Sequence, residues 1–482
     1  MDLRPIAFVT GVLLVILAIT MLVPAAFELF SGASTWRAFL ISAGFTAFIG
    51  SAMAVSTQAK HEHLTVRQAF VMTTAIWLSI ALFGTLPFLL AIEDISLASA
   101  FFESMSGITT TGSTILTGLD TTAPGILVWR SLLQWLGGVG IIVMALSILP
   151  MLGVGGMQLF RSEAFEQSEK LLPRATEIAF SLLQIYSAMT AVTFFALLFS
   201  GMPAFDAFVH ALTSISTGGF SSKDASFSHA AFSGIGIQLT IILAMIAGSL
   251  PFMLYLKSVR GSWRGWLSEP QIPTFFGILA LVIAVIALWQ WQAGTSMGES
   301  FLLTSFNVVS IMTGTGYTST DFGAWGAYAN ATFLLLMFLG GCAGSTTCGI
   351  KIFRFQVLLS TSLAQIRRLA SPRSVVVAHY GRKTITDDIA ESVQVFFYLF
   401  ILSFAGLALA LGFCGLDFIT AISAAATAIT NVGPGLGDIV GPSGTFASLP
   451  DTAKWLMSAG MLLGRLELFT IFALFVPALW RN

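Results

Sequence analysis

The chain alternates long and short apolar segments along most of its length. About ten segments are long enough to cross a membrane, because roughly 20 apolar residues span the hydrocarbon core as a helix. Four others hold only about 12 residues, a length typical of re-entrant or interfacial helices. We predict membrane-spanning helices near 6–30, 36–57, 68–92, 125–150, 177–200, 234–257, 273–294, 327–349, 390–414 and 453–479. The short helices are expected near 97–109, 204–216, 299–313 and 418–430.

Each short segment runs into a turn rich in glycine, threonine and serine. One glycine per turn marks the repeat, at spacings of 106, 98 and 117 residues: Gly112, Gly218, Gly316 and Gly433. A phenylalanine precedes three of them by ten residues: Phe102, Phe208 and Phe306. The pattern predicts an all-α polytopic membrane protein with one helix–short helix–turn–helix unit used four times. We expect an N-terminal helix pair over 1–60 and repeats over 61–165, 166–265, 266–375 and 376–482.

Composition supports the membrane assignment. Hydrophobic residues make up 56% of the chain and charged residues 9%, whereas soluble domains carry roughly 25% charged residues. The first apolar segment is too long for the core of a signal peptide and is expected to be a retained helix. The net charge of −1 gives no reason to expect nucleic-acid binding, and three cysteines are too few for a disulfide scaffold.

Basic residues fall almost entirely on one side of the predicted helices. Cytosolic loops carry an excess of Lys and Arg, so this side, with the N-terminus, is expected to face the cytosol. The four glycine turns then face outward, among many acidic residues that either concentrate cations or are ordinary solvated loop charges. The basic residues are Lys60, Arg67, Arg161, Lys170, Arg174, Lys257, Arg260, Arg264, Arg354, Arg367, Arg368, Arg373, Arg382 and Lys383.

The four turns favour a cation site. Irregular backbone at membrane depth is tolerated only where protein buries it or where it lines a wet cavity. A short helix entering from outside points its partly negative C-terminal end toward the membrane centre. Glycine allows positive φ, which lets successive carbonyls face one axis, and rings of carbonyls replace the hydration shell of a potassium ion. A single turn of this kind would more often be a helix C-cap; four equivalent copies predict a carbonyl ring around an ion.

Specific motifs in these turns resemble a known family. They are Glu103-Ser-Met-Ser-Gly-Ile-Thr-Thr-Thr-Gly112, Ser214-Ile-Ser-Thr-Gly-Gly-Phe220, Ser310-Ile-Met-Thr-Gly-Thr-Gly-Tyr317, Thr430-Asn-Val-Gly-Pro434, Gly340-Gly-Cys-Ala-Gly-Ser-Thr-Thr-Cys-Gly-Ile-Lys351 and Gly464-Arg465-Leu466-Glu467. With these, the whole chain resembles the Trk/Ktr/HKT superfamily of potassium uptake proteins. The extra N-terminal helix pair makes it most similar to the bacterial TrkH/TrkG transmembrane subunit.

The resemblance implies four pseudo-symmetric helix–pore-helix–filter–helix repeats around a central pore, in a homodimer in the bacterial inner membrane. Potassium ion would be the substrate, and this chain would bind no cofactor. A cytosolic TrkA-type regulatory subunit would carry a nucleotide, ATP/ADP or NAD. Membrane lipid is a further expected partner of the basic side.

The resemblance also assigns residues to the filter. Its carbonyls would come from Thr110, Thr111, Gly112, Ser216, Thr217, Gly218, Gly314, Thr315, Gly316, Asn431, Val432 and Gly433. In related plant transporters a serine at the position of Gly112 accompanies sodium preference, so glycine here implies potassium preference.

A second glycine-rich segment interrupts the predicted helix 327–349. Its residues are Gly340, Gly341, Gly344, Ser345, Thr346, Thr347, Gly349 and Lys351. Each glycine costs helix stability, about 1 kcal/mol relative to alanine. The segment is either an intramembrane loop that gates the pore or a helix surface for close Gly-x-x-x-Gly packing; the resemblance favours the gate.

Charged residues inside or beside the apolar segments include Arg465, Glu103 and Lys351, and an unpaired charge is costly in a membrane. Arg465 is expected either to face the pore and gate segment or to pair with an acidic residue of another repeat. Glu103 is expected to brace the filter by hydrogen bonds. Lys351 either belongs to the gate segment or extends to the cytosolic face.

Other functions fit the sequence less well. No Ser, Cys or His lies in a pattern typical of catalysis, so no enzymatic activity is expected. A cation-coupled secondary transporter of another solute is the alternative, although such folds usually carry broken helices in inverted or parallel repeats. The polar stretch 351–389 directly follows the gate segment, and we expect it to bind the cytosolic partner.

Overall fold

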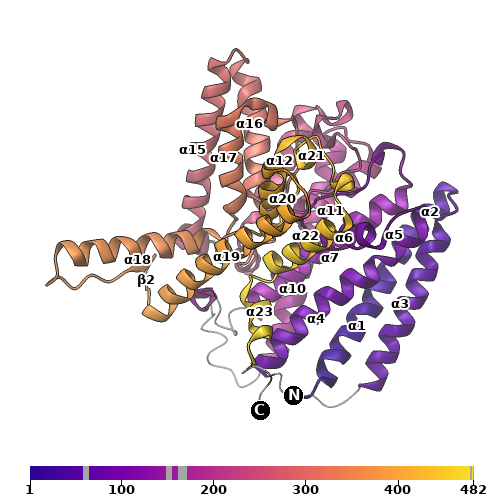
Figure 1. The fold of residues 1–482 in the computed structure, drawn as a ribbon, viewed down its shortest axis with the longest axis horizontal. Coiled ribbons are helices and arrows are strands. Elements are labelled where there is room, and N and C mark those ends of the chain that lie inside the picture. Colours follow the sequence, from indigo (N-terminus) through magenta and orange to yellow (C-terminus); the bar gives the residue numbers. More distant parts are fainter. Residues whose placement is uncertain (58–64, 148–154, 161–170, 478–479, 481–482) are drawn as a thin grey trace.

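The computed structural model describes residues 1–57, 65–147, 155–160, 171–477 and 480. Lys60, Arg161 and Lys170, which the charge pattern placed on the cytosolic side, lie outside these residues. The described chain is nearly all helical (Figure 1). Its one sheet among these residues is a short antiparallel hairpin of β1 (His379–Tyr380) and β2 (Lys383–Thr384).

Seven predicted spans are helices long and apolar enough to cross a membrane. They are α1 (Arg4–Thr20) with α2 (Leu22–Ser31), α3 (Trp36–Ser56), α4 (Val66–Gly84) with α5 (Leu86–Ala91), α7 (Pro124–Ser147), α10 (Leu171–Phe199), α15 (Gln271–Gln292) and α19 (Asp387–Phe413). The chain is therefore a multi-pass membrane protein. Hydropathy predicted these helices because the length and apolarity that a membrane requires are properties of the local sequence.

Three other predicted spans are broken. α12 (Ile235–Ser249) and α13 (Phe252–Val259) meet at 92°, and α22 (Asp451–Arg465) meets α23 (Phe469–Phe472) and η7 (Ala473–Phe475) at 105°. Pro251 accounts for the first break, since proline removes a helical hydrogen bond. At the second break Glu467 and Leu468 have φ of 54° and 58°, outside helical values. The prediction of continuous helices here was wrong.

The third broken span is the predicted helix 327–349. α17 (Ala327–Phe338) ends at Phe338, and α18 (Ile352–Ala370) begins after a non-helical stretch, residues 339–351. We call residues 339–351 the glycine-rich loop. Because Gly340 and Gly344 are not on a helix, the structure does not support Gly-x-x-x-Gly helix packing at this position. α18 extends from the body of the molecule (Figure 1).

The four short helices form where they were predicted, as α6 (Leu97–Ile108), α11 (Ala204–Ile215), α16 (Met297–Met312) and α20 (Phe418–Thr430). Side chains of Ser96, Ser296 and Asp417 cap three of their N-termini, which satisfies amide groups that have no partner within the helix.

The short helices link the repeats into a closed ring. Each one packs against the second helix of the preceding repeat: α11 against α7, α16 against α12, α20 against α17, and α6 against α22. The last contact joins the first repeat to the fourth. The glycine turns that follow these helices are therefore brought together at the centre.

The remaining elements lie in the segments that connect these helices. They are η1 (Leu119–Thr121), η2 (Met157–Phe160), η3 (Ser226–Ser228), η4 (Ala230–Phe232), α14 (Arg264–Ser268), η5 (Phe322–Trp325), α21 (Gly437–Val440) and η6 (Phe446–Ser448).

Candidate functional site

All four short helices end in the same kind of reversal. The residue after the last helical turn adopts a left-handed conformation, with φ of 53° at Thr110, 49° at Thr217, 73° at Gly314 and 53° at Asn431. Glycine is the usual residue there, and other residues cost of order 1–3 kcal/mol and cluster at functional sites. Two threonines at this position indicate that the turns have a role beyond ending a helix.

A second left-handed residue follows two positions later. Gly112, Gly219 and Gly316 have φ of 84°, 81° and 84°. The amides of Thr111, Gly218 and Val432 each donate to a carbonyl five residues earlier, at 2.9, 2.8 and 3.1 Å. Both features align Thr217, Gly218 and Gly219 of the second turn with Thr110, Thr111 and Gly112 of the first.

The predicted register of the second turn was therefore one residue early. Ser216 is in the right-handed helical region, and its hydroxyl donates to the carbonyl of Leu212 at 2.8 Å, so it still belongs to the end of α11. The misleading signal was Phe208, ten residues before Gly218. Phe102 and Phe306 are fully buried, but Phe208 is only partly buried. The buried residue at the equivalent position of the second repeat is Val209, ten residues before Gly219. The sequence Thr-Gly-Gly allows either glycine to take positive φ.

Four glycines from the four turns face one another in order. A Cβ added at Gly112 would clash with the carbonyl oxygen of Gly218, and one at Gly219 with that of Thr315. One at Gly316 would lie 2.7 Å from the amide nitrogen of Gly433, and one at Gly433 would lie 3.2 Å from the carbonyl oxygen of Gly112. We call Gly112, Gly219, Gly316 and Gly433 the glycine ring. Its closure shows that the turns pack backbone to backbone, with no room for side chains.

A cavity of about 70 Å³ opens above the glycine ring. All four ring glycines line it, together with Arg130, Lys223, Asp224 and other residues of the loops that follow the turns. Asp120 neighbours this mouth and pairs with Lys223 at 3.4 Å. Slight burial raises the pKa of Asp120, but hydrogen bonds from the Asp224 amide and from Lys223 outweigh it and lower the pKa below its usual value. Asp120 therefore stays charged at neutral pH.

Side chains tie adjacent turns together. Ser113 Oγ donates to the carbonyl of Gly433 at 2.9 Å, and Asn431 Nδ2 donates to Thr111 Oγ1 at 2.9 Å, which joins the first turn to the fourth. The hydroxyl of Tyr317 lies 2.5 Å from Thr213 Oγ1, which joins the third turn to α11, the short helix of the second repeat. These bonds resist any change in the width of the ring.

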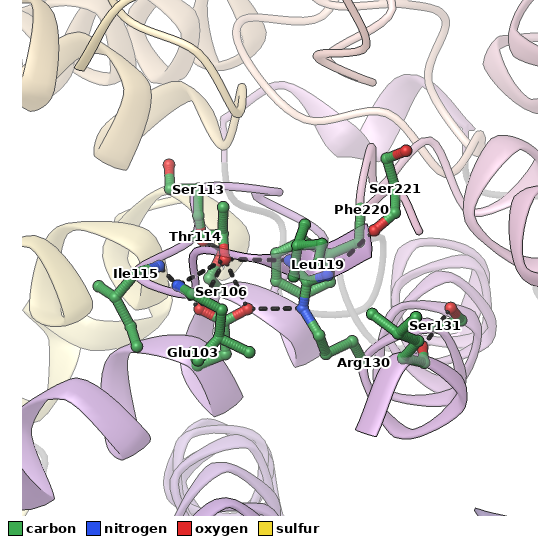
Figure 2. A network of polar contacts seen from close by, with 12 residues as sticks. Glu103, Ser106, Ser113, Thr114, Ile115, Leu119, Arg130, Ser131, Phe220 and Ser221 are labelled. Atoms are coloured by element: carbon green, nitrogen blue, oxygen red, sulfur yellow. Dashed lines mark hydrogen bonds and ion pairs between the residues drawn. The ribbon is translucent and has the colours of Figure 1, made fainter. Parts of the chain in front are cut away.

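Behind the first turn, Glu103 forms a buried network with Arg130 (Figure 2). Its carboxylate lies 2.7 Å from Arg130 Nε and accepts from the Ile115 amide at 2.9 Å and the Thr114 hydroxyl at 2.9 Å. Arg130 also donates to the carbonyl of Ser221 at 3.0 Å and covers the Phe220 ring at 4.0 Å. This geometry agrees with the prediction that Glu103 braces the first turn, and it extends the brace to the second.

Equivalent braces lie in two other repeats. His210 and Asn307 stand nine residues before Gly219 and Gly316, as Glu103 does before Gly112. His210 Nε2 lies 3.0 Å from Ser221 Oγ, and Asn307 bonds both the side chain and the amide of Ser319, at 2.9 and 3.2 Å. The fourth repeat has Ala424 there. The early register of the second turn hid the spacing of His210. The spacing of Asn307 before Gly316 was visible in the sequence and equals that of Glu103 before Gly112.

Replacing Glu103 by alanine is expected to destabilise the protein by about 3–5 kcal/mol, since Arg130, only 1% exposed, would lose its buried ionic partner. Glu103→Gln keeps hydrogen-bond acceptors and should lose less. Thermal unfolding of the purified protein measures both. The matched control is Asp451→Ala, which removes a carboxylate that is 56% exposed and lies 3.5 Å from Lys454. Because Lys454 keeps its hydrogen bond to Ser99 at 2.9 Å, this change should cost no more than about 1 kcal/mol. Equal losses for E103A and D451A would contradict the bracing role.

The glycine-rich loop folds into the break between α12 and α13. The amide of Phe252 donates to the carbonyl of Gly344 at 2.9 Å, and the amide of Thr346 donates to that of Gly248 at 3.1 Å. The Thr346 hydroxyl reaches the carbonyls of Gly248 and Ile215 at 2.8 and 3.1 Å. The loop thus lies directly against the end of α11 and the second glycine turn.

Arg465, which is 1% exposed, holds the other side of this loop. Its Nη1 donates to the Thr346 carbonyl at 3.2 Å and to Cys348 Sγ at 2.7 Å, and its Nη2 donates to the Gly137 carbonyl at 2.7 Å. Arg465 therefore faces the loop, as one of the two expectations had it, and forms no ion pair with another described residue. Lys351 is also buried and donates to the carbonyl of Thr347, so it does not extend to the cytosolic face.

Glu467 pairs instead with Arg354, at the start of α18. The Arg354 side chain is fully buried, donates to the Gly155 carbonyl at 2.9 Å and lies 3.8 Å over the Phe396 ring. The charge pattern placed Arg354 on the cytosolic side, but it did not show that this side chain is buried and paired. The pair couples the break after α22 to the end of the glycine-rich loop.

Among the residues that the structure describes, no group of three or more His, Cys, Asp or Glu side chains is arranged to hold a metal ion. The oxygen atoms concentrated at the centre of the fold are backbone carbonyls and hydroxyls, which suit a weakly bound monovalent cation better than a transition metal.

Comparison with known proteins identifies similar chains. The family described as "TrkH: Cation transport protein" matches residues 37–264 and 274–481. The Trk system potassium uptake protein TrkI of Halomonas elongata is 44% identical over 478 residues, covering 99% of this chain and 97% of that protein. TrkH of Escherichia coli K12 is 35% identical over 488 residues, with 100% of both chains covered. The crystal structure of the potassium transporter TrkH from Vibrio parahaemolyticus superposes with a TM-score of 0.92 at 33% identity, over 100% of both chains.

Proposed function

The chain belongs to the TrkH family of cation transport proteins, and we propose that it takes up potassium ions through the glycine ring. The family is one of transporters and not of enzymes. The observation that carries the proposal is the closure of the ring: four turns from four repeats meet backbone to backbone, each glycine facing the next turn. Such an arrangement leaves carbonyl oxygens as the groups that an ion on the axis meets.

The filter we propose uses the structural register. Its carbonyls come from 110–112, 217–219, 314–316 and 431–433, so Gly219 replaces Ser216 in the original assignment. Left-handed residues at two positions of the turns orient successive carbonyls to the same side. The C-terminal ends of α6, α11, α16 and α20 add partly negative charge. Carbonyls held at fixed spacing by the cross-turn hydrogen bonds replace the hydration shell of potassium at little cost of reorganisation.

The glycine-rich loop acts as the gate in this proposal. It lies against the end of α11 and the second glycine turn, and Arg465 clamps it. An arginine charge on the conduction path also opposes cations by its own field. Opening requires the loop to break the hydrogen bonds of Thr346 with Gly248, Ile215 and Arg465. A partner that pulls on α18, which directly follows the loop, would shift the equilibrium between the closed and open positions of the loop.

We propose that the glycine ring opens to the outer side of a bacterial inner membrane and that the N-terminus is cytosolic, on the strength of the basic residues on the opposite side. A homodimer is supported by the exposed apolar residues Leu359, Ile366 and Leu369 of the projecting helix α18. The cytosolic TrkA-type subunit, with its nucleotide, is proposed to dock on residues 351–389. Each of these assignments extends the family resemblance to this chain.

Neutralising Arg367, Arg368 and Arg373 together is expected to weaken partner binding by about tenfold or more, if each exposed charge contributes roughly 0.5 kcal/mol or more at the interface. Partner-dependent flux should fall in parallel, while the potassium-over-sodium ratio stays unchanged because the filter is untouched. Pull-down with the regulatory subunit and flux into vesicles measure both. If partner binding survives and only lipid dependence changes, the partner binds elsewhere.

The function itself is tested by potassium and rubidium uptake into vesicles that contain only the purified chain and its regulatory subunit. The proposal predicts potassium and rubidium uptake, and slower sodium uptake, down an imposed gradient. Uptake of a different solute driven by a cation gradient, without net potassium flux, would instead indicate a coupled secondary transporter.

A further inference from the structure

A second, larger cavity lies in repeat two, away from the glycine ring. Its volume is about 650 Å³, within the range of roughly 300–1,000 Å³ typical of small-molecule sites. The walls come from α10 and α12, and the base from α13, α14 and the end of α11. Representative lining residues are Ile185, Val192, Leu243, Ala247, Tyr255 and Trp266.

The cavity offers an occupant almost no polar contact. Its hydroxyl groups already donate to their own helices: Thr193 to Met189, Thr240 to Gly236 and Ser258 to Leu254, each at 2.8–2.9 Å. Tyr255 donates to the carbonyl of Ala247, and Trp266 to Ser258 Oγ. A ligand for this site must therefore be apolar over most of its length.

The cavity faces outward. Val192 is 68% exposed and Leu243 is 66% exposed, and both lie on helices whose apolar residues surround the body. In a membrane protein such side chains contact lipid tails. The cavity thus opens sideways into the hydrocarbon region.

One end of the cavity carries the features of a membrane interface. Trp263 lines that end and is 67% exposed, and tryptophan is enriched at headgroup level. Lys257, Arg260 and Arg264 lie beside it, all exposed. In the part of the chain that the structure describes, no ion pair involves these three charges. Clusters of this kind attract anionic headgroups.

We propose that the cavity binds one anionic phospholipid, with an acyl chain between α10 and α12 and its phosphate beside Lys257, Arg260 and Arg264. Ile215 and Ala247 form its inner wall. The carbonyls of Ile215 and of the adjacent Gly248 are the ones that accept from Thr346 of the glycine-rich loop. The bound chain therefore packs against the wall on which the loop rests.

Lipid retention by the purified full-length protein tests the site, with native mass spectrometry as the readout and phosphatidylglycerol and phosphatidylcholine as probes. Ala188→Trp fills the cavity from α10. Its matched control, Ala191→Trp, adds the same side chain to an exposed position of α10 outside the lining. We expect A188W to retain phosphatidylglycerol at least about tenfold less than A191W, because the indole takes the volume of the buried acyl chain.

The headgroup contact is tested by Lys257→Gln, Arg260→Gln and Arg264→Gln together. Its control is Arg367→Gln, Arg373→Gln and Arg382→Gln, which removes the same charge from exposed positions elsewhere. The first triple variant should lose about tenfold or more of phosphatidylglycerol binding and no phosphatidylcholine binding. The control should lose less phosphatidylglycerol binding than the first variant and no phosphatidylcholine binding.

Three results would overturn the proposal: equal retention by A188W and A191W, equal retention of both lipids by the wild type, or loss of dimers in A188W with lipid retention unchanged. The last would assign the cavity to contact with a second copy of the chain. Because the readout is binding and not flux, failure here leaves the potassium proposal untouched.

Discussion

Alanine at Gly219 is expected to reduce potassium uptake at least about tenfold and to lower the potassium-over-sodium ratio. The residue has φ of 81°, and its Cβ would clash with the carbonyl oxygen of Thr315. A non-glycine residue in this region costs about 1–2 kcal/mol, and the clash must also displace the backbone of the third turn. A displaced carbonyl that raises the barrier to conduction by about 1.4 kcal/mol slows it tenfold. Ion flux into vesicles, with potassium and sodium compared, measures the effect.

The control for this substitution is Gly201→Ala. Gly201 has a similar φ of 91°, but nothing lies within 4 Å of the added Cβ. Gly201→Ala therefore measures the effect of backbone strain alone, without a clash in the glycine ring. Gly218→Ala tests the register, since Gly218 does not have positive φ and its Cβ would meet the side chain of Gln134. If G218A changes selectivity and G219A does not, the original register is right and the structural one is wrong.

Deleting Gly344–Thr347 is expected to raise potassium flux in the absence of the regulatory subunit by about tenfold or more. The deletion removes Thr346, whose hydrogen bonds to Gly248, Ile215 and Arg465 hold the loop in place. Three such bonds, at about 0.5–1.5 kcal/mol each, are enough to favour the closed state by that factor. Flux into vesicles without partner measures the change, and size-exclusion chromatography confirms the fold.

A milder variant tests the same contacts with less risk that the protein misfolds. Thr346→Val keeps the shape of the side chain but loses the hydroxyl bonds to Gly248 and Ile215, so it should raise partner-independent flux in the same direction, to a smaller degree. Thr361→Val on α18 is the control, because its hydroxyl bonds only to carbonyls of its own helix. Reduced flux in folded T346V would mean that the loop supports the pore instead of closing it.

Much of the fold follows from local sequence properties. Spans and short helices were predictable because length and apolarity decide whether a helix crosses the membrane. The break at Pro251 was not predicted, although proline is a visible signal, because what stabilises it is remote: the Phe252 amide bonds to Gly344, some ninety positions along the chain.

The site was predictable only in part, for the same reason. The glycine and threonine turns predicted a ring of carbonyls. The second turn contains two adjacent glycines, Gly218 and Gly219, and the sequence alone does not show which one faces the next turn. In the structure it is Gly219, which lies against the carbonyl of Thr315. The ion pair of Arg354 could not be predicted because its partner, Glu467, is more than a hundred residues away. Residues whose role depends on a distant partner cannot be assigned from local pattern alone.

The most direct test of the central claim is to locate the ion. Diffraction from crystals of the purified protein grown in rubidium or thallium salts, measured at the absorption edge, shows where a potassium-like ion binds. We predict an anomalous peak on the axis between the backbone carbonyls of 110–112, 217–219, 314–316 and 431–433, lost in Gly219→Ala. A peak elsewhere in the protein, with none within the ring, would contradict the account.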